Sequence, residues 1–254
     1  MKPATLFVDA DNTLWDTDRV FAEAQLALLD RIEGAIDRRS GSDDRLAFVR
    51  AVDQALAQRH HDGLRYPPRL LARALAQALA GLPAERAARR ALLEGSAATL
   101  AASAASDAEQ AFFAAIGSGP DLRPGVEEGL ADLKAAGHRL FVITEGSRAK
   151  AAQTLERLGL MQFFDRLIEG KKRPELYRRI LRLAGMPANA FMIGDQLDRD
   201  IEPAKAAGLQ TIYFPGGFQP KWAPDEVDCR PDFRIASFAE VPGIVSKVTE
   251  TISA

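Results

Sequence analysis

Asp9 and Asp11 lie two residues apart in the segment Asp9-Ala10-Asp11-Asn12-Thr13, directly after the apolar run Thr5-Leu6-Phe7-Val8. Side chains at positions i and i+2 of an extended strand point to the same side. Two carboxylates that close resist joint ionisation, so the pair needs a cation between them or a proton on one of them. An isolated Asp-x-Asp is more often a solvated loop or a helix cap, so the pair alone decides nothing.

A second candidate is Thr144, which follows the apolar run Leu140 to Ile143 and precedes Glu145-Gly146. A hydroxyl beside backbone N–H groups at a strand-to-helix turn can hold a phosphoryl oxygen. The same residue could simply cap the following helix.

Two further candidates lie later in the chain. Lys171-Lys172 precedes Pro174, and an ammonium there could neutralise an anionic nucleophile and its substrate, although a basic cluster is usually a surface feature. Gly194-Asp195 follows the apolar run Phe191 to Ile193, with Asp200 five residues on. Glycine permits a close turn, and carboxylates are the hard oxygen ligands that Mg²⁺ prefers.

The elements that must position these residues alternate between strands and helices. We expect strands at residues 4–9, 139–144, 166–168, 191–195 and 210–214, and helices at 126–136, 148–158, 174–184 and from the turn after 195 to 207. This alternation predicts an α/β fold with a doubly wound, mainly parallel sheet. Chemistry in such sheets takes place at the carboxyl ends of the strands, where all four candidates fall.

Residues 21–116 show no convincing strand. Apolar residues recur at helical spacing, and breakers such as Tyr66-Pro67-Pro68 and Gly81-Leu82-Pro83 punctuate the pattern. We expect four to six helices here, followed by a linker at Gly117-Ser118-Gly119-Pro120. The sequence thus predicts an α/β core of residues 1–17 and 118–254, with an inserted all-helical domain of residues 18–117.

The composition narrows the class of protein. The 254 residues have a formal net charge of −2, which gives no overall basic field for nucleic acid or an anionic membrane. The single cysteine, Cys229, excludes an internal disulfide and fits a reducing compartment. No apolar run approaches the ~20 residues that a membrane helix needs. We therefore expect a cytoplasmic protein without nucleic-acid or membrane partners.

Histidine and tryptophan give weaker signals. His60-His61 are neighbours, which do not face one ligand on a helix, so a zinc site is not expected. Trp15 could line a pocket or pack at the hinge of the inserted domain. Trp222 is expected to anchor the C-terminal segment.

Together and in this order, the four sites resemble the motifs of the haloacid dehalogenase superfamily. Motif I is Asp9 to Thr13, motif II is Thr144, motif III is Lys171 or Lys172, and motif IV is Gly194, Asp195 and Asp200. The likeness spans residues 4–214, and the helical insertion is similar to that superfamily's C1 cap. We favour Lys172 because Lys-x-Pro-x-x-Tyr-Arg-Arg looks like one branch of its phosphatases. Glu145 departs from the family, where asparagine often follows motif II.

The resemblance implies a Mg²⁺-dependent phosphatase with a Rossmann-like core, acting on a small phosphorylated metabolite through an aspartyl-phosphate. The implied catalytic residues are the nucleophile Asp9, the general acid/base Asp11, Thr144 and Lys172. The implied phosphate-binding residues are Asn12, Thr144, Glu145, Gly146 and Lys172. The implied metal ligands are Asp9, Asp11 through its carbonyl, Asp195 and Asp200. A phosphomutase, a dehalogenase and a non-catalytic binding protein remain as alternatives, and no oligomeric state is indicated.

Overall fold

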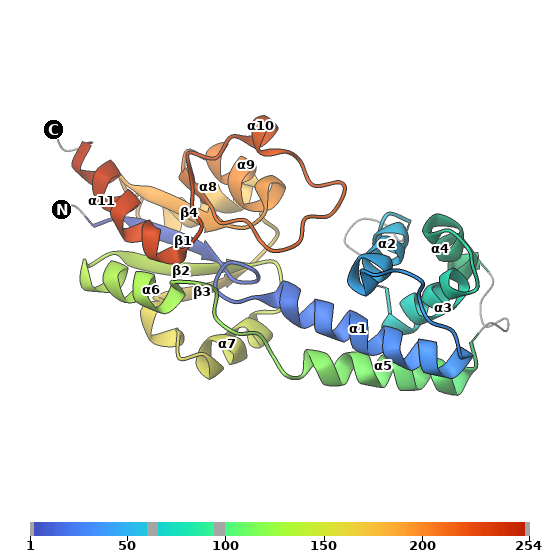
Figure 1. Ribbon diagram of the computed structural model, residues 1–254. Coiled ribbons are helices and arrows are strands. Elements are labelled where there is room, and N and C mark those ends of the chain that lie inside the picture. The colour runs from blue at the N-terminus through green and yellow to red at the C-terminus, as the bar shows by residue number, and fades with distance from the viewer. Residues whose placement is uncertain (1–2, 60–65, 94–99, 252–254) are drawn as a thin grey trace. The chain divides into compact units, whose positions relative to one another are not determined.

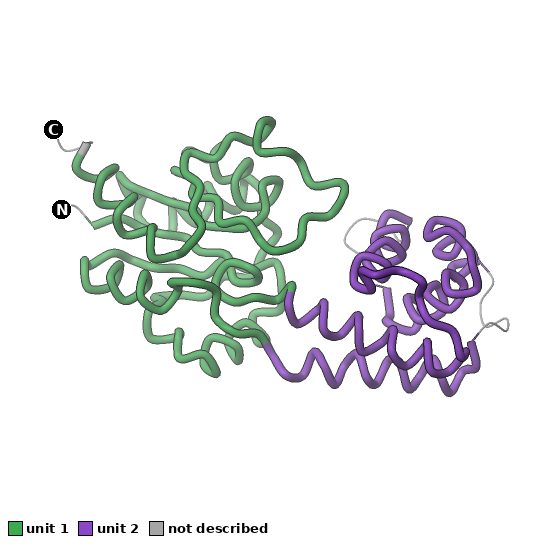
Figure 2. The backbone as a smooth tube through the Cα atoms, in the orientation of Figure 1, with its two compact units in different colours: residues 1–18, 120–254 green, residues 19–119 purple. Residues whose placement is uncertain are grey.

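The chain divides into two compact units. The structure, a computed structural model, describes residues 3–59, 66–93 and 100–251. One unit comprises residues 1–18 and 120–254, and the other residues 19–119 (Figure 2). The first segment of the core ends one residue later than the expected residue 17, and the second begins two residues later than the expected residue 118. The pair His60-His61 lies outside the described residues.

The larger unit, here called the core unit, is built on a sheet of six strands in the order β3-β2-β1-β4-β5-β6 (Figure 1). All neighbouring strands are parallel. The strands are β1 (Thr5–Asp9), β2 (Arg139–Thr144), β3 (Arg166–Glu169), β4 (Ala190–Gly194), β5 (Gln210–Tyr213) and β6 (Phe233–Arg234). The predicted parallel α/β fold is confirmed.

Helices cover both faces of this sheet, because successive side chains of a buried strand point to opposite sides. Leu6 and Val8 of β1 pack in one apolar layer, and Phe7 packs in the other, where its ring stacks on Phe141. The helices of the first layer are α6 (Val126–Ala135), α7 (Arg148–Arg157) and α11 (Val241–Thr251). Those of the second are α8 (Pro174–Leu183) and α9 (Glu202–Lys205). The sheet is therefore doubly wound.

The smaller unit, here called the helical unit, contains only helices among its described residues. They are α1 (Thr17–Ile36), whose first two residues belong to the core unit, α2 (Arg45–Ala57), α3 (Pro68–Leu79), α4 (Ala84–Leu93) and α5 (Ala102–Ile116). Leu28, Leu75, Ala87 and Ala88 lie in its interior, where the small alanines let helices approach closely. The expectation of four to six helices between residues 21 and 116 agrees with these five.

The continuous helix expected to run from the turn after residue 195 to residue 207 is wrong. The chain instead forms a π-helical turn, η2 (Leu197–Ile201), before the short helix α9. Pro203 has no backbone N–H to donate to the preceding turn, so it fits only near the start of a new helix. The wide turn lies directly after β4, where it presents Asp200 to the carboxyl end of the sheet.

The segment after β5 holds more regular structure than the sequence indicated. A short helix α10 (Glu226–Cys229) precedes β6, and a short 3₁₀ turn at Phe238–Glu240 precedes α11; another such turn, Met161–Phe163, lies earlier, between α7 and β3. Trp222 is 51% exposed, so the expectation that it anchors this segment is wrong. None of the described helices combines the length and the apolar character needed to cross a membrane. The cytoplasmic location stays a prediction.

Candidate active site

Asp9 is the last residue of β1, a central strand, so its side chain emerges among the carboxyl ends of β2 and β4. The residue is only 5% exposed. Its Oδ2 accepts a hydrogen bond from the Thr13 hydroxyl at 3.3 Å. Its Oδ1 is bonded to the ammonium of Lys172. A buried carboxylate is thus held at the edge of the sheet where α/β enzymes bind their ligands.

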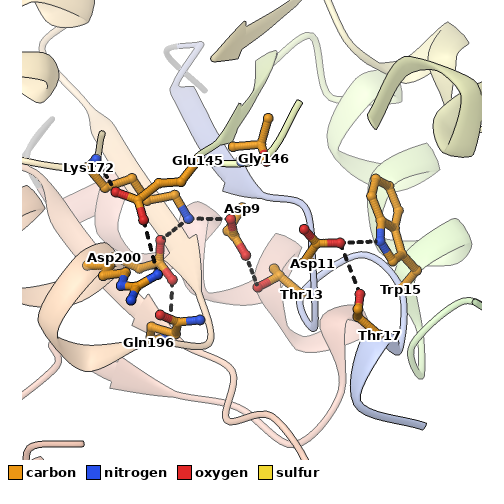
Figure 3. A network of polar contacts seen from close by, with 12 residues as sticks. Asp9, Asp11, Thr13, Trp15, Thr17, Glu145, Gly146, Lys172, Gln196 and Asp200 are labelled. Carbon is orange, nitrogen blue, oxygen red and sulfur yellow. Dashed lines mark hydrogen bonds and ion pairs between the residues drawn. The ribbon is translucent and has the colours of Figure 1, made fainter. Parts of the chain in front are cut away.

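Lys172 lies between two carboxylates (Figure 3). Its Nζ contacts Asp9 and lies 2.6 Å from Oδ1 of Asp200, and its side chain is 5% exposed. The other oxygen of Asp200 accepts from the backbone N–H of Gln196 at 3.0 Å. Lys171 is exposed. Of the two lysines, Lys172 is the one that reaches the carboxylate cluster.

Asp195, the first residue after β4, completes a cluster with Asp9 and Asp200. One ligand oxygen from each of the three lies within 4.8 Å of the other two. Within the described part of the chain, Oδ1 of Asp195 is buried and has no hydrogen-bond partner. A buried acceptor without a partner costs about 1–3 kcal/mol, and more when it is charged. A ligand bound to this oxygen would remove that cost.

Burial shifts the pKa values of this cluster. It raises the pKa of Asp9 to about 7, against the opposing effect of the Lys172 ammonium. Burial, followed by the charges of Asp9 and Asp200, also raises the pKa of Asp195 well above its usual range. Burial alone would lower the pKa of Lys172, but Asp200 and Asp9 outweigh it and keep that pKa high. The cluster holds more negative charge than one ammonium can balance.

A divalent cation fits this donor set. When all groups are ionised, three carboxylates against one ammonium leave two negative charges in a buried space. Carboxylate oxygens are the ligands that Mg²⁺ prefers. Asp9 and Asp195 would hold the ion. Both oxygens of Asp200 already have partners, which favours orienting Lys172 over ligation.

One oxygen of Asp11 is bonded to two residues outside this cluster (Figure 3). Its Oδ1 accepts from Nε1 of Trp15 at 2.9 Å and from the Thr17 hydroxyl at 3.0 Å. Trp15 is 2% exposed, so the indole packs in the core while its N–H donates to Asp11. Neither role expected for Trp15 included this bond.

The loop after Asp11 is fixed by bonds that the sequence did not reveal. Asn12 has a φ of 59°, a left-handed conformation that asparagine tolerates better than most residues. Its side-chain oxygen accepts from the backbone N–H of Asp18 at 2.8 Å, and its side-chain nitrogen donates to the Asp18 carboxylate at 3.0 Å. Arg123 donates to the carbonyl of Asn12 and, at 3.1 and 2.8 Å, to those of Phe214 and Pro215. This guanidinium therefore ties the loop after β1 to the end of β5.

Thr144 ends β2 beside this loop. Its Oγ1 accepts from the backbone N–H of Gly146 at 2.9 Å, which leaves the hydroxyl proton available to a ligand. The backbone N–H of Asn12 is likewise occupied, by the carbonyl of Trp15 at 2.8 Å. The phosphate-binding roles of Asn12 and Gly146 stay predictions, and each would have to share an N–H that is already bonded.

The Glu145 carboxylate has two partners in the core unit. It accepts from the backbone N–H of Lys172 at 2.7 Å and from Arg199 at 3.1 Å. These bonds direct its charge toward η2 and the loop before α8. The phosphate-binding role predicted for Glu145 would therefore fall to its backbone N–H, because both oxygens of its carboxylate already have partners.

A family model described as haloacid dehalogenase-like hydrolase matches residues 3–208. The chain belongs to this family, which confirms the resemblance found in the sequence.

Individual relatives agree with the family. The chain is 36% identical over 126 residues to a glyceraldehyde 3-phosphate phosphatase of Methanocaldococcus jannaschii, covering 47% of this chain and 54% of the relative. It is 32% identical over 133 residues to a phosphoglycolate phosphatase of Nitrosococcus oceani, covering 50% and 58%. The chain thus spans about half the length of these curated relatives.

A solved structure of a haloacid dehalogenase-like family hydrolase from Xanthomonas campestris superposes on the chain with a TM-score of 0.66 at 21% identity. The superposition covers 98% of this chain and 93% of that one. At this identity the likeness concerns the fold.

Proposed function

We propose that the protein is a Mg²⁺-dependent phosphatase that hydrolyses a small phosphomonoester through an aspartyl-phosphate on Asp9. The main support is the position of Asp9, a buried carboxylate at the end of a central strand, bonded to Lys172 and beside the unpartnered oxygen of Asp195. The phosphatase names of the relatives from Methanocaldococcus and Nitrosococcus favour this chemistry over carbon–halogen cleavage.

Asp9 acts as the nucleophile. One of its oxygens attacks phosphorus in line, a new O–P bond forms, and the bond to the leaving oxygen breaks. The attack requires the ionised carboxylate, which burial disfavours and the Lys172 ammonium favours. Lys172 and the Thr144 hydroxyl stabilise negative charge on the transferring oxygens.

Asp11 acts as the general acid and then as the general base. Its protonated carboxyl donates to the leaving oxygen in the first step. In the second step its carboxylate removes a proton from the water that attacks phosphorus, the O–P bond to Asp9 breaks, and phosphate leaves the regenerated Asp9 carboxylate. The bonds from Trp15 and Thr17 to one oxygen of Asp11 hold the side chain on the loop after β1. Its other oxygen remains for proton transfer.

The cation would be held by the carboxylates of Asp9 and Asp195 and the carbonyl of Asp11. When bound, Mg²⁺ supplies positive charge to the nucleophile and to the phosphoryl oxygens. Asp200 orients Lys172 through its 2.6 Å contact. The helical unit corresponds to a C1 cap, an assignment that rests on family analogy, and the substrate is a small phosphorylated metabolite.

The test uses p-nitrophenyl phosphate with purified protein and Mg²⁺. We expect hydrolysis that EDTA abolishes and Mg²⁺ restores. Full activity in EDTA would overturn the proposal. Halide release from chloroacetate would instead identify a dehalogenase, and isomerisation of a sugar phosphate a phosphomutase. A screen of phosphorylated metabolites then defines the substrate.

A further inference from the structure

We infer that Glu145 is a positioning residue that fixes the backbone of Lys172 and thereby aims its ammonium at Asp9. The inference rests on the proposed phosphatase chemistry. Glu145 acts through its contact with the Lys172 backbone, so it is a positioning residue and not a catalytic one.

Glu145 joins the loops that follow three different strands. The residue itself follows β2. Its Oε1 accepts from the backbone N–H of Lys172, in the loop after β3, at 2.7 Å. Its Oε2 accepts from Arg199, in the turn after β4, at 3.1 Å. One carboxylate therefore connects the segments that supply Thr144, Lys172 and Asp200.

The loop of residues 170–173, which holds Lys172, has few other attachments among the described residues. The backbone N–H of Gly170 donates to the carbonyl of Thr144 at 3.0 Å, continuing the pairing of β2 with β3. Two residues on, the Glu145 carboxylate provides the next acceptor. The Glu145 side chain thus extends the attachment of this loop to the end of β2, past the point where the strands stop pairing.

Lysine needs such a support more than most residues. Its ammonium is a point charge at the end of a flexible four-carbon stem. The Lys172 side chain is buried and its Nζ must meet both Asp9 and Asp200, so a displaced backbone would pull the ammonium from one of them. Displacement of a catalytic group by about 1 Å can cost about a hundredfold in rate.

The contact with Arg199 contributes less. The Arg199 side chain is 51% exposed, and exposed ion pairs contribute little because water screens them. The turn that holds Arg199 has another support, because the buried Tyr177 donates its hydroxyl to the Arg199 carbonyl at 3.1 Å. The bond to the Lys172 backbone is therefore the one that affects catalysis.

Three variants separate these two contacts. Glu145→Ala removes both, Glu145→Gln keeps a carbonyl oxygen for the Lys172 N–H, and Arg199→Gln removes only the ion pair. With p-nitrophenyl phosphate and Mg²⁺, we expect kcat of Glu145→Ala to fall about 10- to 100-fold at nearly constant KM. Glu145→Gln and Arg199→Gln should stay within about threefold of the wild type.

Glu240→Ala is the matched control. The Glu240 carboxylate also accepts from backbone N–H groups, those of Ala236 and Ser237 at 2.8 and 2.9 Å, but none of these residues contacts the carboxylate cluster. This variant should lower the unfolding temperature and leave kcat unchanged. Equal kcat in Glu145→Ala and the wild type, or equal losses in Glu145→Ala and Glu145→Gln, would overturn the inference. A rise in KM at constant kcat would also overturn it, because that result would place Glu145 on the substrate.

Amide hydrogen exchange tests the positioning without any activity. Peptides that cover residues 170–176 should exchange about tenfold faster in Glu145→Ala than in Glu145→Gln, because only alanine leaves the Lys172 N–H without its side-chain acceptor. An inactive wild type with this exchange pattern would contradict the proposed phosphatase and leave the backbone support intact. An active wild type without it would contradict the support alone.

Discussion

Carboxylates whose pKa is raised by burial occur in both units of the molecule, and their surroundings differ. In the helical unit, Asp53 accepts from the hydroxyl of Tyr66 and is also hydrogen-bonded by Gln25, and burial raises its pKa to about 6. In the core unit, burial raises the pKa of Asp9 to about 7. A raised pKa therefore does not distinguish the two. A neighbouring cation does not distinguish them either, because the charge of Arg50 acts on Asp53. What distinguishes the core unit is that three carboxylates gather around one ammonium and that Asp195 has a buried oxygen without a partner in the described residues.

The largest expected difference between the two units is in catalysis. Asp9→Asn should lower kcat for p-nitrophenyl phosphate by about 10³-fold or more, because the amide cannot attack phosphorus. Asp53→Asn should leave kcat within about threefold, because side-chain changes away from the reacting groups have small effects. Steady-state kinetics of both variants checks this comparison. An active Asp9→Asn enzyme would contradict the nucleophile assignment.

Metal binding should depend on Asp195 in the core unit and not on Asp53 in the helical unit. Saturating Mg²⁺ at about 100 times its dissociation constant stabilises the state that binds it by about 2.7 kcal/mol, which corresponds to about 5–10 °C in unfolding temperature. Asp195→Asn should abolish this rise, and Asp53→Asn should keep it. Thermal unfolding with Mg²⁺ or EDTA measures the difference without any assay of activity. An undiminished rise in Asp195→Asn would remove Asp195 from the metal site.

Glycine substitutions should have opposite signs in the two units. A Cβ on Gly194 would lie 2.3 Å from Cγ of Asp200, which Lys172 and Gln196 hold in place. Gly194→Ala should therefore destabilise the core unit by about 1–3 kcal/mol. A Cβ on Gly34, within α1, meets nothing within 4 Å, so Gly34→Ala should stabilise the helix by about 0.5–1 kcal/mol. Denaturant unfolding of both variants gives these values, and a neutral Gly194→Ala would contradict the close packing at Asp200.

The smallest expected effect is the pH dependence of the helical unit. The pKa of Asp53 is raised in the folded state from 3.8 to about 6, so its contribution is most favourable below pH 4. That contribution is lost as the pH rises to about 6 and is constant above. Asp53 is half-buried, so solvent screens part of this shift. Asp53→Asn should therefore remove the loss and gain about 1–2 kcal/mol on the wild type between pH 4 and pH 7. Unfolding temperatures at both pH values test this, and a gain independent of pH would exclude titration of Asp53.

The sequence predicted those parts of the site that depend on strand ends. Asp9, Thr144 and Asp195 follow apolar runs, and parallel strands bring their carboxyl ends to one edge. Lys172 was favoured over Lys171 on its motif, and it is the lysine that reaches the cluster.

What remained hidden were side chains whose partners are distant in the sequence. Arg123 bonds the carbonyls of Asn12, Phe214 and Pro215, and no spacing in the chain signals such a contact. The same holds for the two bonds of Glu145, to the Lys172 backbone and to Arg199. Local patterns place a residue on an element, whereas these contacts appear only when the elements have packed.

The parallel sheet has a consequence for the synthesis of the chain. β1 ends at Asp9, but its neighbours in the sheet, β2 and β4, begin at Arg139 and Ala190. More than a hundred residues, including the whole helical unit, must leave the ribosome before β1 finds its first partner. Until then the apolar strand β1 has no partner strand in the sheet, while α1 to α5 can pack through contacts close in sequence. Asp9 is thus synthesised well before Lys172, Asp195 and Asp200, the residues that surround it in the folded core unit.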